Sequence, residues 1–390
     1  MSEIDRITEI KDRAGSGAPN FTNGVNFAGS DSGISPHAHT EGNTEPSSPS
    51  NGDTWWDTDN DIYKVYMDNA WKDWLGTSAP AAPAWGGDRG IISGGEPSSG
   101  GRLVDISRFD ITTAGNAVDF GDLTGASYDG CGVSSGARGV THHGIPSGSS
   151  GTNTLDYFAP ATPGNATDFG DRTVTGYNTV SVSSGVRGVF MGGITGGSYP
   201  AFNTMDYITI ASAGNATDFG DLTNGPQGAS ATNNETRGVR IGGFISSNGF
   251  TNVMDYITIA NTGNATDFGD TLSSGIYNGS IGNVSDNSRG VFAGGYNDSG
   301  YSEVNVMQYI TIANTGNATD FGDLVDTNRG LSACSNGTTG AFSGGYGGGS
   351  VGYVNRIQTI TIGTAGNATD FGDIVQTANY GSHGLSGAAS

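Results

Sequence analysis

An eight-residue motif that recurs about every fifty residues constrains the fold of this chain more than any other feature. GNAVDFGD begins at Gly115, and GNATDFGD follows from Gly164, Gly214, Gly263, Gly316 and Gly366. Successive copies are 49, 50, 49, 53 and 50 residues apart. A regular period of this length indicates a fold built from equal structural units.

Each repeat contains a second anchor and two further strand-like runs. Arg-Gly leads into an apolar run and a glycine pair or its remnant at Arg89, Arg138, Arg187, Arg237 and Arg289, and Thr339-Gly340 takes the sixth place. A run such as NTMDYITI follows, and a Gly-rich run such as YNTVSVSS precedes. Both have the β-branched, aromatic and glycine content of short strands joined by turns. Four strands per repeat is the signature of a propeller blade.

The two ends of the repeat region are complementary. The first repeat starts at Asp88 without a Gly-rich strand, whereas NYGSHGLSG near the C-terminus is a Gly-rich strand with no repeat after it. We therefore predict that the C-terminal strand completes the ring, which removes open sheet edges. The predicted fold is all-β, with a six-bladed propeller of four-stranded blades over residues 88–390.

Most repeated residues have a predicted structural role. The phenylalanine of each DFGD is expected to pack between blades, and the Arg-Gly arginines to donate to carbonyls of the neighbouring blade. The Asn and Asp residues beside the strands are expected to cap their own turns, with calcium binding as the alternative.

The repeats resemble the kelch family. Residues 328–346, NRGLSACSNGTTGAFSGGY, match its order of an arginine, a small-residue strand, a turn, an apolar strand and Gly-Gly with an aromatic. The tryptophan that the family carries late in the blade is replaced by phenylalanine. The resemblance implies a kelch-like propeller whose Gly-rich strands are innermost. Cys131 and Cys334 then lie two blades apart, so both are expected to be free thiols.

The segment before the repeats has a different composition. GDTWWDTDNDIYKVYMDNAWKDWLG predicts three short aromatic-rich strands within a small β module at residues 47–80, after an extended attachment arm or linker at residues 1–46. Ser47 to Gly76 resembles a module of tail-fibre-like virion structural proteins from marine bacteriophages. That resemblance implies a virion component, assembled in the host cytoplasm, whose N-terminal segment contacts other tail or capsid proteins while the C-terminal domain faces outward.

His37 and His39 form a His-x-His element in the arm. The element is similar to one that binds a metal on the axis of trimeric phage fibres, which implies a metal site and a homotrimer through the N-terminal segment. The alternative is that both histidines are solvated in a linker. No other cofactor is expected.

Charge and composition exclude several classes of function. The net charge of −22, with all lysines before residue 80, disfavours nucleic acid and anionic membranes. No apolar run of about 18 residues is present, so no membrane insertion is expected. The propeller has three histidines, His142, His143 and His383, and its acids are mostly repeated. We expect a binding protein and not an enzyme, although a carboxylate pair that hydrolyses polysaccharide stays open.

The candidate site is the mouth of the propeller. Equivalent positions at the start of the Gly-rich strands are Tyr128, Tyr177, Gln227, Tyr277, Arg329 and Tyr380. The variable loops add Tyr199, Phe202, Phe250, Tyr301 and Tyr353. Aromatic faces beside amide and guanidinium groups suit a sugar, so this face is predicted to bind a host surface glycan or a protein. The alternative is that these side chains pack between blades. The rival functions are an architectural virion protein, a polysaccharide-degrading enzyme and a cellular kelch-type interaction module.

Overall fold

The computed structural model describes residues 39–42, 44–50, 52–57, 62–67, 70–73, 87–146, 151–196, 201–245, 249–272, 282–296, 302–349, 351–375 and 379–387. These residues form strands, turns and bends without a helix, and none of them belongs to a helix that could cross a membrane. The chain divides into two compact units, residues 1–80 and 81–390.

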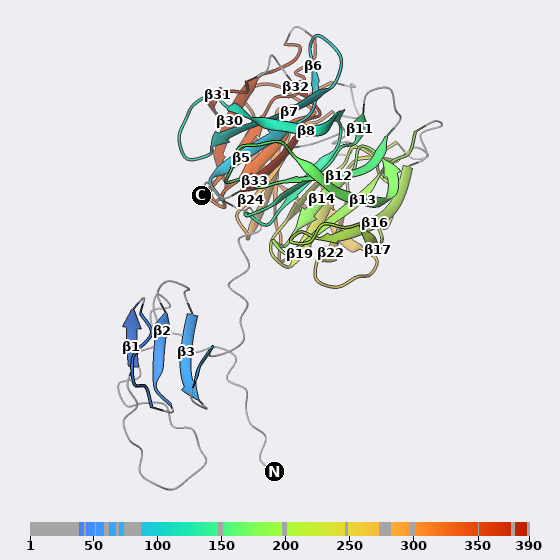
Figure 1. Cartoon of the computed structure of the whole chain (residues 1–390). Coiled ribbons are helices and arrows are strands. Elements are labelled where there is room, and N and C mark those ends of the chain that lie inside the picture. The colour runs from blue at the N-terminus through green and yellow to red at the C-terminus, as the bar shows by residue number, and fades with distance from the viewer. Residues whose placement is uncertain are drawn as a thin grey trace. The chain divides into compact units, whose positions relative to one another are not determined.

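The N-terminal unit contains one four-stranded sheet in chain order (Figure 1), made of β1 (His39–Gly42), β2 (Thr54–Asp57), β3 (Ile62–Met67) and β4 (Ala70–Asp73). β1 pairs with β2 in parallel, and the other pairs are antiparallel. β1 falls in the segment that we expected to be an extended arm, so the sheet begins before residue 47. A hydrogen bond joins β1 to this sheet besides the strand pairing: the indole Nε1 of buried Trp55 donates to the Gly42 carbonyl at 3.0 Å.

Six blades, each with four main strands, form a β-propeller (Figure 1), as predicted. From the channel outward, the first three blades are β33 (His383–Gly387), β5 (Arg89–Ser93), β7 (Leu103–Asp110) and β8 (Val118–Tyr128); β9 (Cys131–Ser134), β10 (Gly139–His142), β12 (Thr152–Phe158) and β13 (Thr167–Gly176); and β14 (Val180–Ser183), β15 (Arg187–Ile194), β16 (Ala201–Thr209) and β17 (Thr217–Asp221).

The other three blades repeat this arrangement. They are β18 (Ser230–Asn233), β19 (Arg237–Ile241), β22 (Val253–Thr258) and β23 (Thr266–Asp270); β24 (Gly282–Ser285), β25 (Arg289–Ala293), β26 (Val306–Thr311) and β27 (Thr319–Asp323); and β28 (Ser332–Ser335), β29 (Thr339–Ser343), β30 (Arg356–Thr361) and β31 (Thr369–Asp373). Five two-residue strands lie in the connecting loops: β6 (Glu96–Pro97), β11 (Ile145–Pro146), β20 (Phe244–Ile245), β21 (Gly249–Phe250) and β32 (Asn379–Tyr380).

The C-terminal strand closes the ring as the sequence predicts. β33 pairs antiparallel with β5, from His383 opposite Ser93 to Gly387 opposite Arg89, and β32 pairs with β6 (Figure 1). The innermost strand of the first blade therefore comes from the end of the chain. This pairing joins the last blade to the first and covers the edge of β5.

The GNATDFGD motif is a junction between consecutive blades. Gly164 and Ala166 donate backbone hydrogen bonds to the carbonyls of Phe120 and Asp122 in the preceding blade, at 2.8 and 2.7 Å, and Asn165 Oδ1 accepts from Asp122 N at 3.1 Å. The same three bonds recur at every junction, including the one between the sixth and first blades. Our expectation that these residues cap their own turns is therefore wrong for the asparagine, which accepts a hydrogen bond from a strand of the preceding blade.

The predicted roles of the repeated phenylalanine and arginine are confirmed. Phe219 is 2% exposed and packs in a cluster with Met205 of its own blade and Ile257 of the next. Arg187 lies over the Tyr207 ring of its own blade, with its guanidinium carbon 4.2 Å from the ring centre. Its Nη1 donates to the carbonyls of Ile259 and Ala260 in the following blade, at 3.1 and 2.8 Å. Both cysteines are free, as expected.

Side chains link the innermost strands, which are not paired with one another as a sheet. Ser183 Oγ donates to the Ser134 carbonyl at 3.2 Å, Asn233 Nδ2 donates to the Ser183 carbonyl at 2.7 Å, and Ser335 N donates to Ser386 Oγ at 2.8 Å. These strands surround a central cavity of about 130 Å³ lined mainly by serine, glycine and valine. Small hydroxyl side chains therefore let the blades approach closely while satisfying backbone groups near the axis.

Candidate ligand-binding mouth

The mouth of the channel is built from one left-handed residue per blade at the start of each inner strand. The described members are Asp129, Asn178, Gly228, Gly330 and Gly381, with φ angles of 57°, 53°, 57°, 66° and 66°. We call these five residues the mouth ring. Backbone bonds connect neighbours in the ring: Gly381 N donates to Gly330 O, Asp129 N to Gly381 O and Asn178 N to Asp129 O, at 3.0, 2.8 and 2.9 Å.

The residue before each member of the mouth ring is the predicted site residue. Each one pairs with the residue that follows the glycine pair of the same blade: Tyr128 with Ile145, Tyr177 with Ile194, Gln227 with Phe244, Arg329 with Tyr346, and Tyr380 with Glu96. The alignment drawn from sequence therefore places these five residues in equivalent structural positions. Tyr199, Tyr277 and Tyr301 lie outside the described residues.

On one side of the mouth the predicted residues are packed. Tyr177 and Gln227 are each 8% exposed, and Tyr177 clusters with Ile145 and Ile194. Phe202 covers Gly176, where a Cβ would lie 2.8 Å from its ring, and Phe250 makes an edge-to-face contact with Phe244 at 5.4 Å. Packing between loops, the alternative to ligand binding, accounts for these four side chains.

On the other side the predicted residues form a half-exposed aromatic and cationic cluster. Arg329 lies over the rings of Tyr296, Tyr346 and Tyr380, with its guanidinium carbon 5.1, 5.2 and 5.6 Å from their centres. Its Nε is 3.1 Å from Glu303 Oε1, and its side chain stays 29% exposed. Tyr353 extends the cluster through an edge-to-face contact with Tyr346 at 5.4 Å.

Tyr128 continues this surface into the second blade. The Arg102 guanidinium carbon lies 4.7 Å from the centre of the Tyr128 ring, and Arg102 Nη1 donates to the Pro146 carbonyl at 3.0 Å. Burial raises the pKa of the Tyr128 hydroxyl above its usual value, with a smaller contribution from the charge of Asp129. Tyr128, Arg102, Arg329, Tyr380 and Tyr353 thus offer flat faces and hydrogen-bonding groups at one mouth.

Asp129 was missed when the sequence was analysed. The residue is 6% exposed, and burial, followed by the charge of Glu96, raises the pKa of its carboxyl group to about 7, while Arg102 and Arg329 act in the opposite direction. The signal was present in the repeats, because Asp129 occupies a position that is glycine or asparagine elsewhere in the mouth ring.

The three propeller histidines, within the part of the chain that the structure describes, belong to no assembled metal site. His143 Nε2 lies 2.7 Å from Asp156 Oδ2, and Gly130 N donates to His383 Nε2 at 2.8 Å. Burial lowers the pKa of His383 to about 3. Over the described ranges, no three His, Cys, Asp or Glu side chains are grouped to hold a metal. His37 lies outside those ranges and His39 begins β1, so the metal prediction in the arm stays a prediction.

Three blades contain a buried acid in the third strand, and each acid has a basic partner. Asp156 is paired with His143, Asp206 with Arg172, and Asp255 with Arg240. In the fifth and sixth blades the same position is Gln308 or Gln358, and no basic partner accompanies it among the residues described around them. Each acid therefore lies beside a buried basic side chain.

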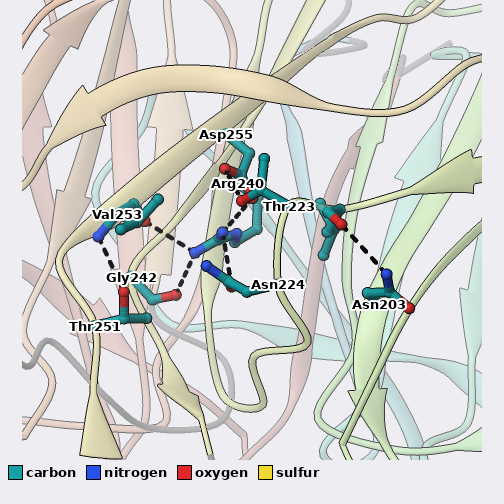
Figure 2. Close-up of polar contacts among 9 residues, drawn as sticks. Asn203, Thr223, Asn224, Arg240, Gly242, Thr251, Val253 and Asp255 are labelled. Carbon is teal, nitrogen blue, oxygen red and sulfur yellow. Dashed lines mark hydrogen bonds and ion pairs between the residues drawn. The ribbon is translucent and has the colours of Figure 1, made fainter. Parts of the chain in front are cut away.

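Arg240 is the most fully engaged of these cations (Figure 2). Besides Asp255, it donates through Nη1 to the carbonyls of Gly242 and Val253 at 2.8 and 2.9 Å, and through Nη2 to Asn224 Oδ1 at 3.2 Å. Thr223 Oγ1 donates to Asp255 Oδ1 at 2.6 Å. Burial lowers the pKa of Arg240, and the attraction of Asp255 opposes that shift.

Fold and mouth together define a six-bladed β-propeller protein with a loop-lined mouth. No protein-family model matches the chain, and no curated protein matches it in sequence. Among solved structures, that of YjhT matches 74% of this chain and 95% of its own length, with a TM-score of 0.57 and 14% sequence identity. At that identity the similarity supports the fold alone.

Proposed function

We propose that the protein is a bacteriophage virion protein of the tail-fibre or appendage type whose propeller binds a host surface glycan at the mouth. The virion part rests on the resemblance of residues 47–76 to tail-fibre-like proteins. The binding part rests on one observation: Tyr128, Arg329 and Tyr380 are half-exposed at equivalent positions around one side of the mouth.

A sugar suits this surface better than other ligands. Tyrosine faces stack on the C–H faces of a pyranose, while guanidinium and carboxylate groups bond its hydroxyls. The net charge of −22 disfavours nucleic acid. The repeated acids support the fold, which favours a binding role over catalysis, and a second virion protein is the alternative occupant.

A glycan array probed with the full-length protein tests the binding part. We expect the protein to bind a subset of host-type glycans, and Tyr128→Ala and Tyr380→Ala to lose that binding because each removes a stacking face. Val186→Ser is the matched control, since Val186 is 58% exposed in the turn after β14, at the opposite end of that strand from the mouth. Equal binding by all four proteins would refute the role of the mouth.

Mass spectrometry of purified virions tests the virion part. We expect peptides of this chain at a copy number comparable to other tail proteins. A monomeric protein that is missing from virions would favour the cellular interaction module. Release of reducing ends when the protein is incubated with host polysaccharide would identify an enzyme instead.

A further inference from the structure

Asp129 breaks the symmetry of the mouth ring in a way that the fold does not need. Glycine adopts the left-handed conformation without strain, and three of the five described ring positions are glycine. The backbone bonds of Asp129 to Gly381 and Asn178 need no side chain. An aspartate here therefore adds a backbone cost and a buried charge without a structural gain.

The Asp129 carboxylate lies beside Gly381 of the mouth ring. It is 94% buried, since 6% of the residue is exposed, and among the described residues Oδ1 receives no hydrogen bond. A Cβ placed on Gly381 would lie 2.5 Å from this oxygen and 3.1 Å from the aromatic ring of Tyr128. Both side chains therefore lie next to Gly381 in the mouth ring. Native proteins rarely leave a buried carboxylate oxygen unsatisfied, and such a group is a candidate for ligand binding.

The charges around Asp129 restrict the ligand that it can take. Glu96 on β6 repels it, while Arg102 and Arg329 attract it without forming an ion pair with it. Arg329 is already 3.1 Å from Glu303 Oε1, and Arg102 donates to Pro146 O. Two acids therefore face this part of the mouth, which disfavours an acidic sugar and favours a ligand that supplies hydroxyl donors.

Aromatic rings stand beside the carboxylate. Tyr128 precedes Asp129 in the chain, and Tyr380 precedes Gly381, which Asp129 touches. The Tyr380 ring covers Gly330, where a Cβ would lie 2.3 Å from Cε2. A carboxylate accepts a strong hydrogen bond from a sugar hydroxyl, and a nearby ring can cover the apolar face of the same sugar.

We propose that the Asp129 carboxylate is the specificity-determining group of the mouth, accepting a hydrogen bond from a hydroxyl of a neutral sugar next to Tyr128 and Tyr380. This inference rests on the proposed glycan-binding function and names the sugar class. Because the ionised carboxylate is the stronger acceptor, affinity should increase between pH 6 and pH 8.

The test compares the full-length protein with Asp129→Gly, Asp129→Asn and Asn287→Gly on an array of neutral and sialylated or uronic oligosaccharides. Asp129→Gly restores the residue found at three other ring positions, so it should fold at least as well as the wild type. Asn287→Gly makes the same kind of change at a left-handed residue, with φ of 74°, in the turn after β24 at the opposite end of that strand from the mouth, and it controls for backbone effects.

We expect the wild type and Asn287→Gly to bind neutral oligosaccharides, and both Asp129 variants to bind them at least tenfold more weakly at pH 8. If the Asp129 variants bind within twofold of the wild type while Tyr128→Ala does not, the inference fails and the glycan-binding function stands. If the wild type prefers acidic oligosaccharides, the inference likewise fails and the glycan-binding function stands. If the wild type binds no glycan on the array, the function and the inference both fail.

Discussion

The buried pair of Arg240 and Asp255 provides a quantitative test of how the blades tolerate charge. Both side chains are fully buried, and the equivalent residues of the fifth blade, Phe292 and Gln308, are uncharged. Arg240→Phe introduces the side chain that the fifth blade already has at the equivalent position, Phe292. It leaves the Asp255 carboxylate with the Thr223 hydroxyl as its remaining described partner.

Removing one partner of a buried ion pair costs about 3–5 kcal/mol, because the other charge stays desolvated. We therefore expect Arg240→Phe to lower the free energy of unfolding by about that amount. The double variant Arg240→Phe/Asp255→Gln copies the fifth blade, where Gln308 Oε1 accepts from Leu272 N at 2.8 Å. It should unfold within about 1 kcal/mol of the wild type, since a neutral replacement of both partners is close to neutral in stability.

Urea unfolding followed by far-UV circular dichroism measures this cycle. Tryptophan fluorescence is unsuitable, because all five tryptophans lie at or before residue 85 and none is within the blades. The coupling energy is the loss in the double variant minus the sum of the two single losses. If the losses add, so that the double variant is the least stable, the charge pairing does not explain Arg240.

Three further predictions concern the mouth, the junctions and the closure. Asp129→Asn should remove a pH dependence of stability. A pKa of about 7 in the folded state means that the folded wild type binds the proton more tightly than the unfolded chain does. Urea unfolding between pH 4 and pH 7 should therefore show the free energy of unfolding of the wild type falling by on the order of 4 kcal/mol relative to the variant. Gly220→Ala should cost about 1–3 kcal/mol, since φ is 139° and the new Cβ would lie 2.5 Å from Gly263 O, whereas Gly164→Ala, with no atom within 4 Å, should be neutral; equal melting temperatures would contradict the junction geometry. Deleting residues 379–390 should abolish cooperative unfolding and cause aggregation on size-exclusion chromatography, because β5 loses its partner, and a monomeric, cooperatively unfolding product would argue against closure.

The number of blades and the way they close were determined by the sequence alone. Periodicity is a local property of the chain, and the missing strand before Asp88 matched the spare strand at NYGSHGLSG without any knowledge of contacts. The repeated phenylalanine and Arg-Gly arginine could likewise be assigned, since a residue needed in every unit recurs in every unit.

The tertiary structure decided which residues of the mouth are available. Tyr128 and Tyr177 occupy equivalent positions, yet Tyr177 is buried with Ile145 and Ile194 from two blades, whereas Tyr128 packs at the edge of that cluster, partly buried, beneath Arg102. Exposure depends on what the neighbouring loops place against a side chain, and those loops vary in sequence. The unpaired state of Asp129 also depends on where Glu96 and the two arginines lie after folding.

Long-range pairing was also beyond the reach of the repeat pattern. The basic partners of Asp156, Asp206 and Asp255 occupy three different positions within their blades. No common spacing in the chain therefore links each acid to its partner. The motif asparagine bonds a strand about 43 residues earlier in the chain. The sequence repeat shows which positions are the same in every blade. What each of these positions contacts depends on how one blade packs on the next.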